Sequence, residues 1–333
     1  MSGERISKPR GLKTCRLQGG EKLDTTGNGE FKHIPVLPKE VIEILNPHKG
    51  GIYVDGTLGG GGHSELIAKE AGDDVKIIGI DQDPEAIRAA EKKLSFLGER
   101  VTFVRDNFRN LNRILDELGV DYVDGMLLDL GVSTYQLETP ERGFSFSESE
   151  KDLNAPLDMR MDPSQELTAY DVVNTYEEGE LRDILFRYGE EPFSRNIARR
   201  IVFARKIKPI ETTNELLGII KSATSPKYRF SRKKGHYASK TFRAISIEVN
   251  QELAVLNEVI PQAIKRLKKG GRFVAISFYS GEDRIVKHSF RNMAHEEKPI
   301  VALVTKKPVF ATEEEIAINP KAASARLRAV EKL

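Results

Sequence analysis

The sequence contains a single cysteine, Cys15, among 333 residues. One thiol cannot form an internal disulfide or a cysteine metal cluster, and such scarcity fits the reducing cytoplasm. The six histidines are scattered without pairing, so no metal site is predicted. No apolar run approaches the roughly 18 residues that a membrane span requires, and the first thirty residues lack the apolar stretch of a signal peptide. We therefore expect a cytoplasmic protein without a membrane anchor.

A large excess of one charge is also absent, because the formal net charge is only +2. This total hides a local asymmetry. From Glu138 to Glu191 there are 5 basic and 15 acidic residues, a net charge of −10. From Arg195 to Lys240 there are 13 basic and 2 acidic residues, a net charge of +11, with tyrosine and phenylalanine interleaved. Such a basic and aromatic stretch is typical of RNA-binding surfaces. The alternative is that the two stretches neutralise each other across an internal interface.

The order of apolar segments predicts an α/β fold. Residues 1–30 are basic and rich in Gly and Thr, and they predict a flexible tail, with a basic RNA-contacting arm as the alternative. From Phe31 onward, short apolar strands alternate with helices, which argues for a parallel sheet covered on both faces. The predicted strands are 51–55, 75–80, 101–104 and 123–128, and the predicted helices between them are 64–70, with Ser64 as N-cap, 84–97 and 111–118.

The alternation stops after Gln136. Residues 137–240 contain no convincing strand, but helices are predicted at 177–188, 194–206 and 213–223. A long helix at 242–268, ended by two glycines, then leads into strands 272–278 and 300–305, with a helix at 283–293 between them. We therefore predict an α/β domain made of 31–136 and 241–333, interrupted by a helical substrate-recognition insertion at 137–240.

A glycine-rich turn from Gly56 to Gly62 follows the first predicted strand, and such a turn lets a ligand approach the backbone closely. A phosphate-binding P-loop needs Lys followed by Ser or Thr after its last glycine, but His63 and Ser64 stand there. No register satisfies G-x-G-x-x-G, so a nicotinamide or flavin cofactor is disfavoured. S-adenosylmethionine remains, because it has no pyrophosphate and the turn need only accommodate its methionine part and ribose.

Four residues fall at or just beyond the carboxyl ends of the predicted strands, where open α/β sheets bind ligands. They are Asp55, Asp81, Phe108 and Asp129. A carboxylate at Asp81 would accept hydrogen bonds from ribose hydroxyls. Simpler explanations stay open for several residues here: a turn cap for Asp55, a helix start for His63, a core position for Phe108 and a helix cap for Asp83.

Nine stretches, taken together, resemble the ribosomal RNA small subunit methyltransferase H family. They run in family order from His33 to Arg328, so the resemblance covers nearly the whole chain except the tail. The run LDLGVS with RGFSF and PLDMRMD is far more specific than any glycine loop. The stretches are HIPVLPKEV, YVDGTLGGGGHS, IGIDQDPEAI, LLDLGVSTYQLETPERGFSF, PLDMRMDP, YGEEPFSRNIARRIV, KTFRAISIEVNQEL, GGRFVAISFYSGEDRIVK and NPKAASARLR.

The resemblance implies a class I S-adenosylmethionine-dependent methyltransferase, in which a Rossmann-like α/β domain carries an inserted all-α domain. It implies methylation of the N4 amino group of a cytosine in the decoding region of 16S rRNA. The partner would be small-subunit rRNA or the assembled small ribosomal subunit, with a monomer and a homodimer both open. The cofactor contacts implied by the resemblance are Gly61, Gly62, His63, Asp81, Phe108, Asp129 and Gln136.

The sequence departs from the family pattern in stretches that we assign to substrate contact or its support. Tyr279 replaces a histidine, Gly281 a leucine and Ala155 a glycine, while the family's T-R-T-F-Q-A reads S-K-T-F-R-A over 239–244. The cofactor positions are intact. The residues expected to contact RNA are Arg142, Arg160, Arg232, Lys240 and Tyr279.

The chemistry of methyl transfer narrows the choice of target atom. Methylation of cytosine at carbon C5 needs a covalent nucleophile, usually a cysteine, and Cys15 lies in the tail far from every motif. Attack by the N4 amine makes its N–H bonds more acidic, so an acceptor placed beside them stabilises the developing charge. Asp129 is the candidate acceptor; the other role open to it is to bind the cofactor alone.

The base must leave its stack to reach such a site. Phe144, Phe146 and Tyr279 are candidates for stacking on it, and core packing is the alternative for each. Two other functions stay open at this point: a methyltransferase of the same fold that acts on another RNA base, and a non-catalytic S-adenosylmethionine-binding protein that assists ribosome assembly.

Overall fold

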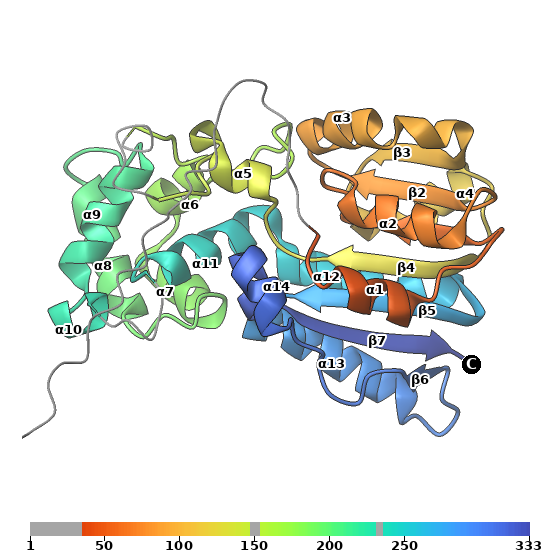
Figure 1. Ribbon diagram of the computed structural model, residues 1–333. Helices are drawn as coiled ribbons and strands as arrows, with labels where there is room; N and C mark the ends of the chain where they lie inside the picture. The colour runs from red at the N-terminus through yellow and green to blue at the C-terminus, as the bar shows by residue number, and fades with distance from the viewer. Residues whose placement is uncertain (1–34, 147–153, 231–235) are drawn as a thin grey trace, which may run out of the picture. The chain divides into compact units, whose positions relative to one another are not determined.

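The computed structural model describes residues 35–146, 154–230 and 236–333 (Figure 1). The tail predicted over 1–30 and Arg232, a predicted RNA contact, lie outside these ranges. None of the described helices is long and apolar enough to cross a membrane.

Seven strands form one sheet in the order β3-β2-β1-β4-β5-β7-β6 (Figure 1). Each neighbouring pair from β3 to β5 is parallel, whereas β7 runs antiparallel to both β5 and β6. The predicted α/β class with a mostly parallel sheet is therefore confirmed. The strands are β1 (Ile52–Asp55), β2 (Lys76–Asp81), β3 (Val101–Arg105), β4 (Val123–Asp129), β5 (Leu267–Ser277), β6 (Val301–Leu303) and β7 (Arg326–Lys332).

Helices cover both faces of the sheet. Successive side chains of a strand point to opposite faces, so neighbouring residues of one strand pack against different helices. On β4, Leu127 belongs to an apolar cluster with α1, α2 and α3, whereas Met126 and Leu128 belong to a second cluster with α4, α12 and α13. These helices are α1 (Pro38–Leu45), α2 (Gly62–Ala71), α3 (Pro84–Lys93), α4 (Leu111–Glu117), α12 (Glu252–Arg266) and α13 (Ser280–Ala294).

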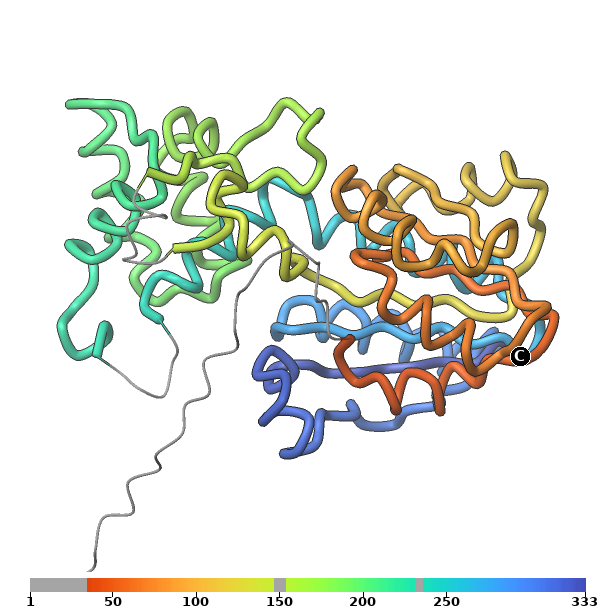
Figure 2. The backbone as a smooth tube through the Cα atoms, turned by 45° about the horizontal axis from the view of Figure 1, so that its top comes forward, coloured from red at the N-terminus to blue at the C-terminus, as the bar shows by residue number. Residues whose placement is uncertain are grey.

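A third apolar cluster lies in the chain between β4 and β5, where the described residues contain no strand. Figure 2 traces this segment leaving the sheet after β4 and returning through α11 and α12. Its buried members include Val172, Leu185, Ile201, Ile220 and Ile245, each from a different helix. The helices are α5 (Thr134–Glu138), α6 (Ala169–Thr175), α7 (Glu178–Arg187), α8 (Ser194–Arg205), α9 (Thr213–Ala223), α10 (Pro226–Arg229) and α11 (Ser239–Asn250).

The long helix predicted over 242–268 is wrong in two ways. It is divided into α11 and α12 at Gln251, which has a left-handed backbone with φ 53°. The apolar periodicity runs through the break, so it gave no sign of it. The helix also ends at Arg266, and Gly270 and Gly271 lie inside β5.

Other boundaries also differ from the predictions. Ser64 is not an N-cap, because α2 begins at Gly62 after Gly61. The helix predicted over 84–97 ends at Lys93 and is followed by a 3₁₀ turn, η1 (Ser95–Arg100). β7 was not predicted from the sequence. Its charged residues form ion pairs with neighbouring elements, as Arg328 does with Asp283 of α13. The remaining short elements are η2 (Phe108–Asn110), η3 (Pro140–Arg142), α14 (Glu313–Ile318) and η4 (Pro320–Ser324).

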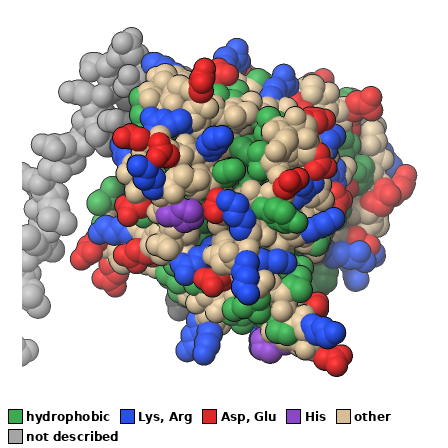
Figure 3. All heavy atoms as spheres, turned by 90° about the vertical axis from the view of Figure 1, so that its right-hand side faces the viewer, with side chains coloured by type: hydrophobic (Ala, Val, Ile, Leu, Met, Phe, Trp, Pro, Cys, Tyr) green, Lys and Arg blue, Asp and Glu red, His purple; other side chains and the backbone are tan. Residues whose placement is uncertain are grey.

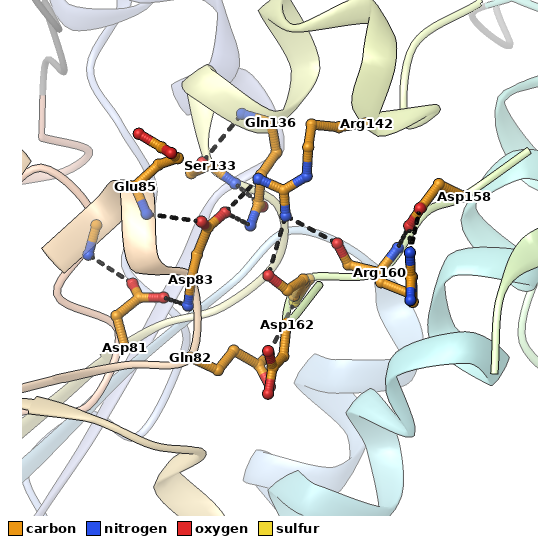
Figure 4. A network of polar contacts seen from close by, with 12 residues as sticks. Asp81, Gln82, Asp83, Glu85, Ser133, Gln136, Arg142, Asp158, Arg160 and Asp162 are labelled. Carbon is orange, nitrogen blue, oxygen red and sulfur yellow. Dashed lines mark hydrogen bonds and ion pairs between the residues drawn. The ribbon is translucent and has the colours of Figure 1, made fainter. Parts of the chain in front are cut away.

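A buried carboxylate connects the β2–α3 turn to the start of the helical segment (Figure 4). Asp83 is 1% exposed and caps α3, because its Oδ1 accepts the Glu85 N–H at 3.0 Å. Its Oδ2 accepts the Gln136 amide at 2.9 Å and the Arg142 guanidinium at 2.6 Å. Arg142 also donates to the carbonyl oxygens of Arg160 and Met161. One guanidinium thus joins three segments that are far apart in sequence.

Replacing Arg142 with Ala should reduce the free energy of unfolding by about 3–5 kcal/mol, because it leaves a buried charge without its partner. Urea unfolding of the full chain measures this loss. The control is Arg182→Ala, which removes an exposed pair with Asp183 and should change stability by less than about 0.5 kcal/mol. Equal midpoints for the two variants would show that the Asp83 network does not support the fold.

Candidate active site

A cavity of about 510 Å³ lies at the carboxyl ends of β1, β2 and β4, within the size range of small-molecule sites. One side is formed by the β1–α2 loop and by residues that follow β2 and β3. The opposite side is formed by α11, the start of α12 and the β5–α13 turn. The cavity therefore has a half next to the sheet and a half next to the helical segment.

The β1–α2 loop owes its shape to glycine and to one carboxylate. Gly59 and Gly61 have φ values of 50° and 77°, which side chains with a Cβ rarely adopt. Asp81, at the end of β2, accepts the Gly59 N–H at 2.8 Å and the Asp83 N–H at 2.9 Å. Burial raises the pKa of Asp81 to about 6, against the lowering effect of these two backbone donors. The hydrogen bond from the Gly59 N–H to Asp81 thus holds the loop against the end of β2.

A second carboxylate, at the end of β1, also supports the loop. Asp55 is buried at the end of β1 and accepts the Ser64 hydroxyl at 2.8 Å and the Thr57 N–H at 3.3 Å. Burial raises its pKa, and His63 and these hydrogen bonds act in the opposite direction. Both carboxylate oxygens of Asp55 thus have partners in the loop or in the first turn of α2, and these contacts agree with the explanation of Asp55 as a cap of the turn.

His63 and Asp129 face each other with their hydrogen-bonding capacity unused. Nε2 of His63 lies 3.5 Å from Oδ2 of Asp129. Both ring nitrogens of His63 and Oδ1 of Asp129 are buried without a hydrogen-bond partner. The backbone N–H of Asp129 donates to the Thr57 hydroxyl at 2.6 Å, which fixes the end of β4 against the loop. Buried polar atoms without partners are rare, and here they line a cavity, so they are available to a ligand.

The half of the cavity next to the helical segment contains four groups that can ionise. Arg243 lies with its guanidinium carbon 4.8 Å from the ring centroid of Tyr279. Burial raises the pKa of Glu252 to about 7 and that of Glu282 to about 8. Burial also raises the pKa of Tyr279, whose hydroxyl has no hydrogen-bond partner. Phe144, Phe146 and Phe242 line the same half and supply apolar surface.

Comparison with known proteins identifies the family. A model of the MraW methylase family matches residues 30–333. The chain belongs to the MraW methylase family. It is 48% identical over 317 residues to the ribosomal RNA small subunit methyltransferase H of Clostridium botulinum (strain Kyoto / Type A2), which covers 91% of this chain and 100% of that protein. It is also 48% identical to the protein of the same name from Carboxydothermus hydrogenoformans, over 91% and 99% of the two chains.

Family membership confirms the resemblance predicted from the sequence stretches, and S-adenosylmethionine is the cofactor of this MraW-family chain. Among solved structures, a putative rRNA-methylase from Clostridium thermocellum is similar at a TM-score of 0.43 and 13% identity, over 90% of this chain and 100% of that one. A similarity this low gives no information about the site.

The cavity of this MraW-family chain fits a sulfonium nucleoside. It offers acceptors for ribose hydroxyls at Asp81, an apolar ring at Phe108 and unpartnered polar atoms at His63 and Asp129. Of the seven predicted cofactor positions, six line the cavity: Gly62, His63, Asp81, Phe108, Asp129 and Gln136. Gly61 does not line it. A Cβ at Gly61 would come within 3.0 Å of Leu94, so this glycine allows the loop to approach α3.

The predicted RNA contacts do not lie together. Arg142 and Arg160 have their guanidinium groups engaged inside the protein, the first with Asp83 and the second with Asp158 (Figure 4). Lys240 donates to the carbonyl oxygen of Glu190 at 2.7 Å. Tyr279 is 7% exposed and lines the cavity. These contacts argue against Arg142 and Arg160 as RNA-binding groups, and of the four predicted RNA contacts that the structure describes, Tyr279 alone lines the cavity.

Several lining residues were not singled out from the sequence. Gln82, directly after Asp81, accepts from Asn107 through its amide oxygen and lies beside the predicted ribose acceptor. Glu252 and Arg243 come from either side of the helix break at Gln251, and Glu282 comes from α13. The resembling stretches contain Arg243, Glu252 and Glu282, but nothing in their spacing indicates that they meet. Among the described residues no group of His, Cys, Asp and Glu is arranged to hold a metal ion.

Proposed function

We propose that this protein methylates the N4 amino group of a cytosine in the decoding region of 16S rRNA, within the small ribosomal subunit or its rRNA. The observation that carries the proposal is the unpartnered Oδ1 of Asp129, buried between the half of the cavity that suits the cofactor and the half lined by aromatic rings. The MraW-family membership and the name of the relatives, ribosomal RNA small subunit methyltransferase H, support the substrate class.

The half of the cavity next to the sheet would hold the cofactor. Asp81 would accept the ribose hydroxyls and Phe108 would pack on the adenine, while Gly62 and His63 would contact the methionine part. The bound cofactor supplies an electrophilic methyl group on a sulfonium, which departs as a neutral thioether. The walls of the cavity hold the two reactants in line and exclude water, and such positioning alone can contribute roughly 7–11 kcal/mol.

Asp129 is the proposed catalytic residue. The N4 amine of cytosine is a weak nucleophile, because its lone pair is delocalised into the ring. As the new carbon–nitrogen bond forms, Oδ1 of Asp129 accepts a hydrogen bond from an N4 hydrogen and then takes that hydrogen as a proton, so that the product leaves as a neutral amine. Nε2 of His63 lies 3.5 Å from the other oxygen, Oδ2, and would orient the carboxylate. The single cysteine, Cys15, lies outside the described residues, and the described residues that line the cavity supply no thiol nucleophile for C5 chemistry.

RNA is proposed to bind along α8. Arg195, Arg199 and Arg200 are exposed on this helix, and no carboxylate of the described residues lies within ion-pair distance of them. Phe203 on α8 and Phe186 on the adjacent α7 are 62% and 65% exposed, which provides apolar surface beside the three charges. By contrast, Figure 3 shows acidic and basic side chains interspersed on the side opposite the arrowheads of β2 and β4. The α7–α8 surface thus combines three cations without ion-pair partners among the described residues with two exposed aromatic rings.

The function is tested by incubating the full chain with labelled S-adenosylmethionine and small ribosomal subunits that lack the modification. Mass spectrometry of the nuclease digest should find the label in N4-methylcytidine, from one position of the decoding region. Label in another nucleoside would identify a different RNA methyltransferase. Cofactor binding without any transfer would indicate a non-catalytic role.

Asp129→Asn should lower kcat by about 10²-fold or more, because the amide cannot take the proton, while the dissociation constant of the cofactor changes only a few-fold. Single-turnover methylation and calorimetric titration measure the two quantities. The matched control is Asp121→Asn, an exposed carboxyl just before the other end of β4. Full turnover with normal cofactor affinity would remove Asp129 as the proton acceptor.

Replacing Arg195, Arg199 and Arg200 together with Gln should weaken RNA binding and make it less dependent on salt. Each lost phosphate contact reduces the magnitude of the negative slope of log K against log salt by about 0.7–0.9, so three lost contacts should reduce it by about 2–3. Binding is measured over a series of salt concentrations. A control that replaces the exposed Lys298, Lys306 and Lys307 with Gln removes the same charge elsewhere. Equal slopes for the two triple variants would exclude α8 as the RNA face.

A further inference from the structure

The half of the cavity next to the helical segment contains two carboxyl groups and one guanidinium. Glu282 is 4% exposed at the start of α13, and Glu252 lies at the start of α12. Arg243 lowers the pKa of both carboxyl groups, whereas the charge of Glu252 raises the pKa of Glu282. One guanidinium can balance one carboxylate, so the second carboxyl group is better accommodated in its neutral form.

The hydrogen bonds of Glu282 decide which oxygen is free. Its Oε2 accepts the N–H groups of Phe278 at 2.8 Å and of Tyr279 at 3.4 Å. No described residue donates to Oε1, while the side chain lines the cavity. Glu252 also has one engaged oxygen, but its Oε1 accepts a side-chain hydroxyl, that of Ser246 at 2.9 Å, rather than two backbone N–H groups. Glu282 therefore presents one oxygen that is not used by the fold, on a side chain whose position is fixed through the other oxygen.

The surroundings of Glu282 fit the edge of a planar base. The Tyr279 hydroxyl and Arg243 Nε are buried without partners. Phe242 and Phe146 lie with ring centroids 4.6 Å apart, and both line this half of the cavity. Asp129 lines the same cavity, so a base bound against these rings would lie in a continuous space that both acids border.

We infer that Glu282 selects the base, by donating a hydrogen bond from Oε1 to the ring nitrogen N3 of the cytosine while Asp129 faces the N4 amine. This inference rests on the proposed function and adds to it the residue that distinguishes cytosine. Cytosine N3 is an acceptor, so it pairs with a neutral carboxyl group. Uracil carries a hydrogen on N3, so the same carboxyl group would meet it donor to donor and would have to ionise in a buried site.

The raised pKa of Glu282, about 8 because of burial, supports this assignment. At neutral pH the neutral form predominates, and Oε1 carries the hydrogen because Oε2 is occupied by two N–H donors. As the pH rises through about 8 the carboxyl loses this hydrogen, and turnover on cytosine should fall. The charged groups that act on it are Glu252 from α12 and Arg243 from α11.

The test compares small subunits that carry cytidine or 3-deazacytidine at the mapped target. The deaza analogue retains the amine but has a C–H in place of N3. Wild-type protein should lose about tenfold or more in kcat/KM on the analogue, because the hydroxyl of Glu282 is left without an acceptor. Glu282→Gln should keep this preference, since its amide donates to N3, and should lose the decline in rate above pH 8. Glu282→Met should be slower on cytidine and should not distinguish the two substrates.

The control is Glu258→Gln on the exposed side of α12, which should reproduce the wild-type ratio and thereby correct for any electronic effect of the analogue on N4. Unfolding midpoints and cofactor affinity show whether the Met variant is folded. A Met variant that retains the wild-type ratio would overturn the role of Glu282 and leave the proposed function intact. A wild-type protein that forms no N4-methylcytidine would overturn the proposed function itself.

Discussion

The arrangement of the site depends on the buried pairing of Asp83 with Arg142 and Gln136. Asp83 lies two residues after Asp81, which holds the glycine loop. Arg142 belongs to the helical segment that supplies the other side of the cavity. The carboxylate is nearly inaccessible to water, so its charge is tolerated only while both partners are present. The same contact therefore stabilises the fold and joins two segments that border the cavity.

The cavity walls retain polar atoms that the fold does not satisfy. His63, Asp129 and Tyr279 each bury at least one atom without a hydrogen-bond partner, although a folded chain usually pairs such atoms. Asp55, by contrast, has both oxygens engaged, by the Thr57 N–H and the Ser64 hydroxyl. Asp81 accepts one N–H on each oxygen and also lines the cavity, so a second lone pair on each oxygen remains for a ribose hydroxyl. The protein thus uses Asp55 for the loop alone and leaves other polar groups for ligands. Local violations of this kind are expected at functional sites rather than in the core.

The sequence predicts what depends on local order. Strands β1 to β4 and the positions of Asp81, Phe108 and Asp129 follow from apolar runs and from the rule that ligands meet the carboxyl ends of parallel strands. The group at Arg243 and Glu282 could not be predicted in this way, because it joins α11 and α13 across a helix break that apolar periodicity does not reveal. Arg142 illustrates the same limit, since a basic residue in an RNA-binding protein gives no sign that its charge is used internally.

The sheet neighbours β4 and β5 are separated in sequence by the whole helical segment, yet they form a central parallel pair. Bringing their ends together as a flexible coil would carry an entropic cost of loop closure, which grows with the logarithm of the loop length. The apolar cluster of α6 to α11 reduces this cost, because the intervening chain can collapse into a compact body before the strands meet. Completion of the sheet, and with it the shared cavity, is then expected to come late in folding, after the helical part has formed.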